Sequence, residues 1–159
     1  MKNVTVGEVH RIHGIVTCPI HEDTPLEEVI NRLVNEPVLR GIILIDSNKR
    51  FSGVITLRDL EKWARFKLFG GKGRLDISAW YFFRILEAKK AKELLTTDKW
   101  SLAVNEADNL QTALDKMLDY DTGVLAVVDG EGRILGDITL SDVLSKAIEL
   151  GKQMGESKK

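Results

Sequence analysis

The chain has 159 residues, of which 43% are hydrophobic and 30% are charged, and its formal net charge at pH 7 is -1. This balance is typical of a folded globular protein and argues against a disordered chain or a strongly basic nucleic-acid-binding protein. A single cysteine excludes an internal disulfide, and no apolar run approaches the roughly 18 residues of a membrane span. Because the start MKNVTVGEVH also lacks the apolar stretch of a signal peptide, we expect a cytoplasmic protein that binds neither nucleic acid nor membrane.

The first elements predicted along the chain are a short strand and an amphipathic helix. Residues 14–20 (GIVTCPI) form an apolar run of the kind found in strands. Apolar residues then recur at helical spacing over residues 26–34. At the start of this helix we expect Thr24 to cap, Pro25 to occupy the first helical position and Glu27 to complete a capping box.

A β-hairpin and a second helix follow. The runs 41–46 (GIILID) and 50–55 (RFSGVI) are apolar and rich in β-branched residues, and the turn-forming residues SNK join them. A closing helix is predicted to begin at Thr56. The second half of the chain predicts the same series, with a strand at 100–104, a helix over 110–118, a hairpin of 123–128 and 133–138, and a closing helix over 140–148.

One short motif occurs twice, as GVITLRD at residues 53–59 and as GDITLSD at residues 136–142. Its recurrence within two matching series indicates two copies of one β-α-β-β-α unit, hence an α+β fold. Neither unit is large enough to bury its sheet and both helices well by itself, so we expect the two copies to pack through their sheets. The expected division is a first repeat over 1–65, an aromatic helical linker over 66–90, a second repeat over 91–152 and a polar tail over 153–159.

Both copies resemble the cystathionine β-synthase (CBS) domain, so the chain looks like a tandem CBS pair, the arrangement called a Bateman module. The resemblance runs through DTPLEEVINRLVNEPVLRGIILIDSNKRFSGVITLRDL and ADNLQTALDKMLDYDTGVLAVVDGEGRILGDITLSDVL and leaves out residues from about 66 to 90. It implies a regulatory module that binds AMP, ADP, ATP or S-adenosylmethionine, associates as a homodimer and acts on a partner protein. A ligand-free dimerisation scaffold is the alternative, and no set of residues in the sequence indicates an enzyme.

The Thr and Asp of the repeated motif are candidates for two roles. They can form a capping box, in which the Thr caps the helix and the Asp answers from the third helical position. A helix N-terminus directly after a strand is also a seat for phosphate, and an adjacent carboxylate can accept hydrogen bonds from a ribose. By resemblance to adenosine-binding CBS domains, Asp59 and Asp142 would hold the ribose. The phosphate-side candidates are Thr56, Thr139, Arg40 and Arg58.

The resemblance also implies an adenine pocket between the first strand and the hairpin of each copy. The expected lining residues are Cys18, Ile20, Ile42 and Val54 in the first copy, and Leu102, Val104, Leu125 and Asp137 in the second. Two differences separate the copies: Arg40 has Gly123 as its counterpart, and the carboxylate Asp137 stands where the first copy has Val54. We therefore expect the first copy to take AMP or ATP, and the second to be empty or to take adenosine or S-adenosylmethionine.

Two features lie outside the repeated units. Seven of the ten aromatic residues fall within residues 63–83, and we expect part of this segment to be buried in a homodimer. The other feature is a group of metal-capable side chains, His10, His13, Cys18 and His21, within twelve residues. Metal binding there is an alternative to polar residues at the rim of a cleft, and we expect no metal, because short clusters of this kind often occur without one.

Overall fold

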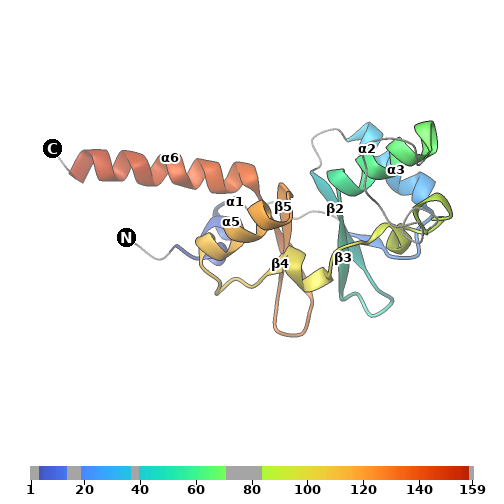
Figure 1. Cartoon of the computed structure of the whole chain (residues 1–159). Helices are drawn as coiled ribbons and strands as arrows, with labels where there is room; N and C mark the ends of the chain where they lie inside the picture. Colours follow the sequence, from blue (N-terminus) through green and yellow to red (C-terminus); the bar gives the residue numbers. More distant parts are fainter. Residues whose placement is uncertain (1–3, 14–18, 37–39, 71–83, 158–159) are drawn as a thin grey trace. The chain divides into compact units, whose positions relative to one another are not determined.

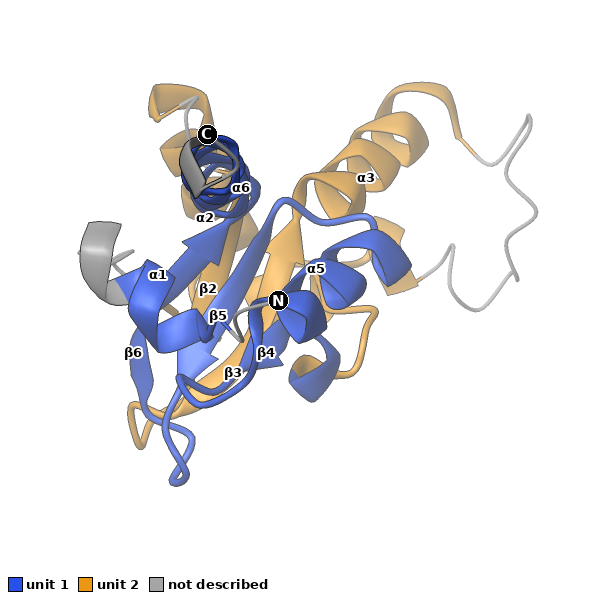
Figure 2. Ribbon diagram, turned by 90° about the vertical axis from the view of Figure 1, so that its left-hand side faces the viewer, with its two compact units in different colours: residues 1–17, 100–159 blue, residues 18–99 orange. Residues whose placement is uncertain are grey.

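A computed structural model describes residues 4–13, 19–36, 40–70 and 84–157, and it has the mixed α+β class expected from the sequence (Figure 1). The chain divides into two compact units, shown in different colours in Figure 2: unit 1 comprises residues 1–17 and 100–159, and unit 2 comprises residues 18–99. These units do not coincide with the ranges 1–65 and 91–152 expected for the repeats. Residues 1–17 belong with the second copy of the repeated motif, and residues 91–99 belong with the first.

Unit 2 is a three-stranded sheet with helices packed on one face. Its elements are β1 Ile20–His21, α2 Leu26–Asn35, β2 Gly41–Ile45, β3 Phe51–Thr56, α3 Leu57–Phe69 and the 3-10 helix η1 Ala91–Leu94. The strand order is β1-β2-β3, with β1 parallel and β3 antiparallel to β2. The core joins Ile42, Leu44 and Ile55 of the sheet to Val29 of α2 and Leu94 of η1.

Unit 1 repeats this arrangement. Its elements are α1 Val6–His13, the 3-10 helix η2 Lys99–Leu102, β4 Ala103–Val104, α5 Leu110–Asp119, β5 Val124–Val128, β6 Ile134–Thr139 and α6 Leu140–Ser157. The strand order β4-β5-β6 again has one parallel and one antiparallel pair. Both predicted hairpins are thus confirmed, and both shift register at the same place, at Leu44/Ile45 and at Val127/Val128.

The start of α2 differs from the prediction. Pro25, not Thr24, is the N-cap residue, and the structure records no side-chain cap hydrogen bond there. A backbone bridge takes the place of the capping box: Leu26 N donates to Lys89 O at 2.8 Å, and Ala91 N donates to Thr24 O at 2.9 Å. Because the segment before η1 satisfies these backbone groups, a side-chain cap is unnecessary.

The same bridge occurs in unit 1. Leu110 N donates to Val4 O at 2.7 Å, and Val6 N donates to Asp108 O at 2.8 Å. The two bridging segments, residues 4–10 and 89–95, stand 85 positions apart, nearly the spacing of the two motifs. Each copy of the fold is thus completed by a segment that precedes the other copy in the sequence.

The closing helices are longer than expected. α3 runs to Phe69, into the range assigned to the linker, and ends at Gly70, whose φ of 69° suits glycine at a helix C-terminus. α6 continues to Ser157, through residues expected to form a polar tail. Most of the aromatic linker, residues 71–83, lies outside the described part of the chain. Among the helices in the described ranges, none has both the length and the apolar character of a membrane span.

Candidate functional site

The register of each hairpin brings its Thr and Asp to one end of the sheet. Thr56 pairs with Gly41 at the end of the first hairpin, and Thr139 pairs with Val124 in the second. In both copies the strand passes directly into the closing helix, so the Thr is the last strand residue and the Asp lies in the first helical turn. The repeated motif therefore forms a strand-to-helix junction in each unit.

In unit 2 this junction is a complete capping box. Thr56 N and Thr56 Oγ1 both donate to Asp59 Oδ2, at 2.9 and 3.0 Å, and Asp59 N donates to Thr56 Oγ1 at 3.2 Å. Asp59 is only 7% exposed. Its second carboxylate oxygen, Oδ1, accepts a hydrogen bond from Thr96 Oγ1 at 2.9 Å. The predicted capping role of Thr56 and Asp59 is thus confirmed.

Unit 1 reproduces the box. Thr139 N and Oγ1 donate to Asp142 Oδ2 at 2.8 and 3.0 Å, and Asp142 N donates back to Thr139 Oγ1 at 3.3 Å. Asp142 is 6% exposed. Burial of a carboxylate is costly unless hydrogen bonds satisfy it, and in both copies the backbone and hydroxyl of the Thr supply them.

Two arginines lie at the junction in unit 2. Arg40 immediately precedes Gly41, the partner of Thr56, and its side chain is exposed; Arg58, also exposed, stands in the first turn of α3. Their counterparts in unit 1, 83 positions on, are Gly123 and Ser141. The first junction therefore carries two cationic side chains at positions where the second carries none.

The residues predicted to line the first adenine pocket do not share one face of the sheet. Ile42 pairs with Ile55 and so lies on the face that packs against the helices. Val54, one residue earlier in β3, lies on the opposite face, which it shares with Thr56, because side chains alternate along a strand. Ile20 pairs with Leu44 on the helix-covered face, and Cys18 lies outside the described residues.

The second set divides in the same way. Val104 and Leu125 share one face of the sheet in unit 1, because Val104 pairs with Val127, two residues beyond Leu125. Asp137 pairs with Ala126 on the other face and is 6% exposed. Leu102, in η2, is 2% exposed. Alternation thus allows Val54 and Asp137 to line a pocket with their Thr, whereas Ile42 and Leu125 lie on the helix-covered face.

Gly53 and Gly136, the glycines of the repeated motif, each lie against a residue of a bridging segment. A Cβ on Gly53 would lie 2.7 Å from Leu95 Cδ1, and a Cβ on Gly136 would lie 2.1 Å from His10 Cε1. His10 Nδ1 also lies 3.3 Å from Asp137 O. Leu95 and His10 are 85 positions apart, so they are equivalent members of the two bridging segments. Each glycine therefore makes room for a side chain of this segment.

Sequence reasoning missed the contributions of Leu95, Thr96 and His10. A signal was present, because residues 6–10 (VGEVH) and 91–95 (AKELL) match in pattern, with Glu8 corresponding to Glu93. Each glutamate accepts a hydrogen bond from a backbone N–H just before its helix: Thr5 N donates to Glu8 Oε2, and Lys89 N donates to Glu93 Oε2. Extending the search for the repeat upstream would have included these segments.

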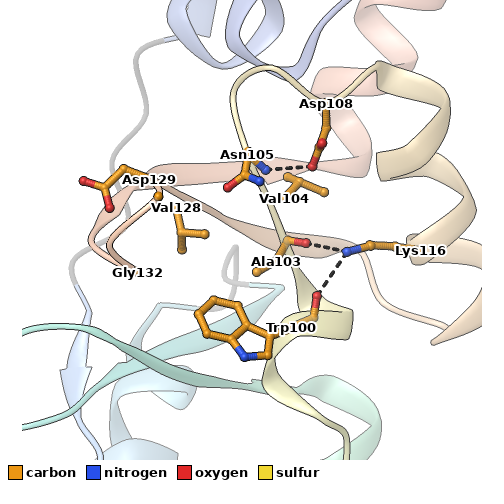
Figure 3. Close-up of a pocket in the computed structure, with 10 residues that line it drawn as sticks. Trp100, Ala103, Val104, Asn105, Asp108, Lys116, Val128, Asp129 and Gly132 are labelled. Atoms are coloured by element: carbon orange, nitrogen blue, oxygen red, sulfur yellow. Dashed lines mark hydrogen bonds between the residues drawn. The ribbon is translucent and has the colours of Figure 1, made fainter.

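The described residues also form cavities away from the junctions. One, of about 320 Å³, is in unit 1 between β4 and the turn of the second hairpin (Figure 3). Lys116 borders it and donates to Ala103 O at 2.7 Å and to Trp100 O at 3.1 Å, so this ammonium group is engaged in holding β4. Another, of about 530 Å³, is in unit 2 between α2 and α3, with Leu26, Ile30 and Trp63 among its walls. The Thr and Asp of the motifs line neither cavity.

Comparison with known proteins accounts for the duplication. The family described as CBS domain matches residues 18–65 and 91–149. The chain belongs to the CBS domain family. A curated relative, an uncharacterised protein of Methanocaldococcus jannaschii, is 26% identical over 135 residues; these make up 85% of this chain and 28% of that protein. The chain thus spans little more than a quarter of that relative's length.

Solved structures of CBS proteins share the fold. A CBS domain-containing protein from Thermotoga maritima is 28% identical, with 91% of this chain and 94% of that chain covered and a TM-score of 0.70. CBSX2, solved in complex with AMP, is 22% identical, with 93% and 98% covered and a TM-score of 0.65. The CBS domain pair of protein MJ0100, solved with 5'-methylthioadenosine and S-adenosyl-L-methionine, is 18% identical, with 95% and 99% covered and a TM-score of 0.62.

Ion pairs join the bridging segment of residues 89–95 to Asp23 in the first CBS repeat. Lys92 Nζ lies 2.9 Å from Asp23 Oδ1, and Lys90 Nζ lies 3.9 Å from the same oxygen. The hydrogen bond from Lys92, more than the charge of either lysine, lowers the pKa of Asp23 below its usual value. The same contact raises the pKa of Lys92. Both groups are exposed, so the pair is a surface contact that adds to the backbone bridge.

The four metal-capable residues near the start of the chain fall only partly within the described residues. His10 belongs to unit 1 and lies against Gly136, whereas His21 belongs to unit 2, where its Nε2 lies 3.3 Å from Ser47 Oγ. The side chain of His13 and all of Cys18 lie outside the described part. Within that part, no group of three or more His, Cys, Asp or Glu side chains is placed to hold a metal ion.

Proposed function

We propose that this CBS pair is a regulatory module that binds adenosine-containing ligands, with the ribose held by Asp59 in the first copy and by Asp142 in the second. One observation carries the proposal: both copies place a buried carboxylate beside the N-terminus of a helix that follows a strand directly. Such a terminus favours phosphate, and the carboxylate can accept hydrogen bonds from ribose hydroxyls. The AMP and S-adenosylmethionine complexes of structural relatives support this class of ligand.

The two sites differ in the ligand charge that they favour. Arg40 and Arg58 give the first site two cationic side chains where the second has Gly123 and Ser141, and Asp137 adds a carboxylate on the face shared with Thr139. The first site therefore takes a phosphate-bearing nucleotide such as AMP or ATP. The second takes adenosine or S-adenosylmethionine, or stays empty. Calorimetry with AMP that gave two sites of equal affinity would contradict this assignment.

The module acts as a homodimer through its exposed helix faces. Val34 at the end of α2 and Leu118 at the end of α5 are each 70% exposed, and they are equivalent residues 84 positions apart. On α6, Leu144 and Ile148 are also apolar and exposed, with 54% and 62% of their surfaces accessible. Both copies thus present apolar surface on the corresponding helices, which a second copy of the chain can cover. Ligand binding would change packing or assembly and so act on a partner protein.

A thermal-shift titration tests the ligand class. The purified chain is heated with AMP, ADP, ATP, S-adenosylmethionine or NADH in turn, with GMP as the control for phosphate and ribose without adenine. A ligand at 100 times its Kd adds about 2.7 kcal/mol to stability, which for a chain of this size raises the melting temperature by roughly 5 to 10 °C. Adenosine compounds that leave the melting temperature unchanged would favour the alternative, a dimerisation scaffold without a ligand.

A further inference from the structure

The carboxylate of Asp59 has little capacity left for a ligand. Its Oδ2 accepts two hydrogen bonds from Thr56, at 2.9 and 3.0 Å, and these bonds cap α3. An ionised carboxylate oxygen has about two acceptor positions, so Oδ2 is fully used. The ribose must therefore be accepted at Oδ1, where Thr96 Oγ1 already donates at 2.9 Å. Oδ1 can accept hydrogen bonds from both hydroxyls of a ribose only if the hydrogen bond from Thr96 is broken.

The position of Thr96 is fixed by the bridging segment. Leu94, two residues earlier, is 1% exposed in the core, and Leu95 fills the space above Gly53. The Thr96 side chain itself is exposed. A rotation about its χ1 bond can thus release Asp59 Oδ1 while the backbone of the segment stays in place.

The second copy lacks this hydroxyl. The residue equivalent to Thr96, 85 positions earlier, is Arg11. Asp142 nevertheless accepts the same two bonds from Thr139 as Asp59 accepts from Thr56. The copies thus differ in sequence at the position of Thr96, whereas their capping boxes are alike.

We infer that Thr96 is an affinity-determining residue of the first site, because its hydroxyl competes with the ligand's ribose for Asp59 Oδ1. This inference rests on the proposed function. An intramolecular donor that occupies the acceptor must be displaced each time a ligand binds, so removing it strengthens binding. A typical hydrogen bond has a net value that corresponds to about a three- to tenfold change in affinity.

Calorimetry with AMP tests the inference in an Asp142→Ala background, which leaves only the first site intact. Thr96→Val removes the hydroxyl and keeps the shape, Thr96→Ala removes it in a second way, and Thr96→Ser retains it as the matched control. We expect Val and Ala to bind AMP about three- to tenfold more tightly than the Asp142→Ala parent, and Ser to bind like that parent. Melting temperatures establish that each variant is folded.

The possible results separate the two proposals. If the parent binds AMP and the Val and Ala variants bind it equally or more weakly, Thr96 is no competitor, although the nucleotide site stands. If neither the parent nor these variants bind AMP, the inference and the assignment of AMP to the first site fail together. If only the Val and Ala variants bind AMP, the inference is supported, because the Thr96 hydroxyl then competes strongly enough to prevent binding in the Asp142→Ala parent.

Discussion

Substituting Gly136 by alanine tests the packing between the bridging segment and the second hairpin. A Cβ at this position would lie 2.1 Å from Cε1 and 2.9 Å from Nδ1 of His10, so the imidazole ring would have to leave its place. Overpacking of this kind typically costs about 1 to 3 kcal/mol. For a chain of this size each kcal/mol lowers the melting temperature by about 2 to 4 °C, so we expect Gly136→Ala to lower it by roughly 3 to 10 °C.

Gly136 also has a φ of 159°, at which a residue with a side chain is strained, so a double-mutant cycle is needed to separate the share of the loss that comes from the contact. With His10→Ala in place the added Cβ has space, so the double variant should be less destabilised than the sum of the single variants, by about 1 kcal/mol or more. Thermal and urea unfolding measure the four proteins. Gly130→Ala is the matched control, because a Cβ there meets nothing within 4 Å. If Gly136→Ala costs no more than Gly130→Ala, or if His10→Ala gives no relief, the described packing is wrong.

Three further predictions concern charge, capping and assembly. Because the Lys92 hydrogen bond lowers the pKa of Asp23, the ionised carboxylate stabilises the fold at pH values above its usual pKa near 3.8, and this stability is lost as the pH falls further. The melting temperature should therefore fall more steeply below pH 4 in the parent than in Asp23→Asn. Parallel curves for the two proteins would refute this. Asn109 caps α5, because its Oδ1 accepts a hydrogen bond from Thr112 N at 2.8 Å. Asn109→Ala should lower the free energy of unfolding by about 1 kcal/mol in a denaturant titration and leave the affinity for AMP unchanged. A parallel loss of affinity would mean that loss of a helix cap alone disturbs the sites. Leu144→Glu on α6 should halve the mass measured by light scattering, and an unchanged mass would exclude this face from the dimer interface.

Local pattern was sufficient to predict most of the secondary structure. Alternating apolar residues and turn signals placed both hairpins, and the duplicated Thr and Asp identified the two strand-to-helix junctions together with their capping boxes. These features depend on residues close together in the sequence, so a single sequence contains the necessary information. The family followed from the same motif, because its two occurrences fall at the same place in two matching units.

Contacts between distant segments could not be predicted in the same way. Thr24 was expected to cap α2, but the backbone of residues 89–91 satisfies that helix start, and nothing near Thr24 in the sequence indicates this. The contact of His10 with Gly136 likewise joins segments at opposite ends of the chain. The hairpin register places Ile42 and Val54 on opposite faces of the sheet, a division that alternation along the strands would have predicted if the register had been worked out residue by residue.

The most direct test of the central claim is calorimetric titration of AMP into the parent chain and into the Asp59→Ala/Asp142→Ala double variant, with Asn109→Ala as the control for loss of a helix cap. We predict measurable binding by the parent and by the control. Hydrogen bonds to a charged acceptor are worth about 1.5 to 3 kcal/mol, so the double variant should lose about tenfold or more in affinity. A parent without affinity for AMP, or a double variant that binds as tightly as the parent, would contradict the account.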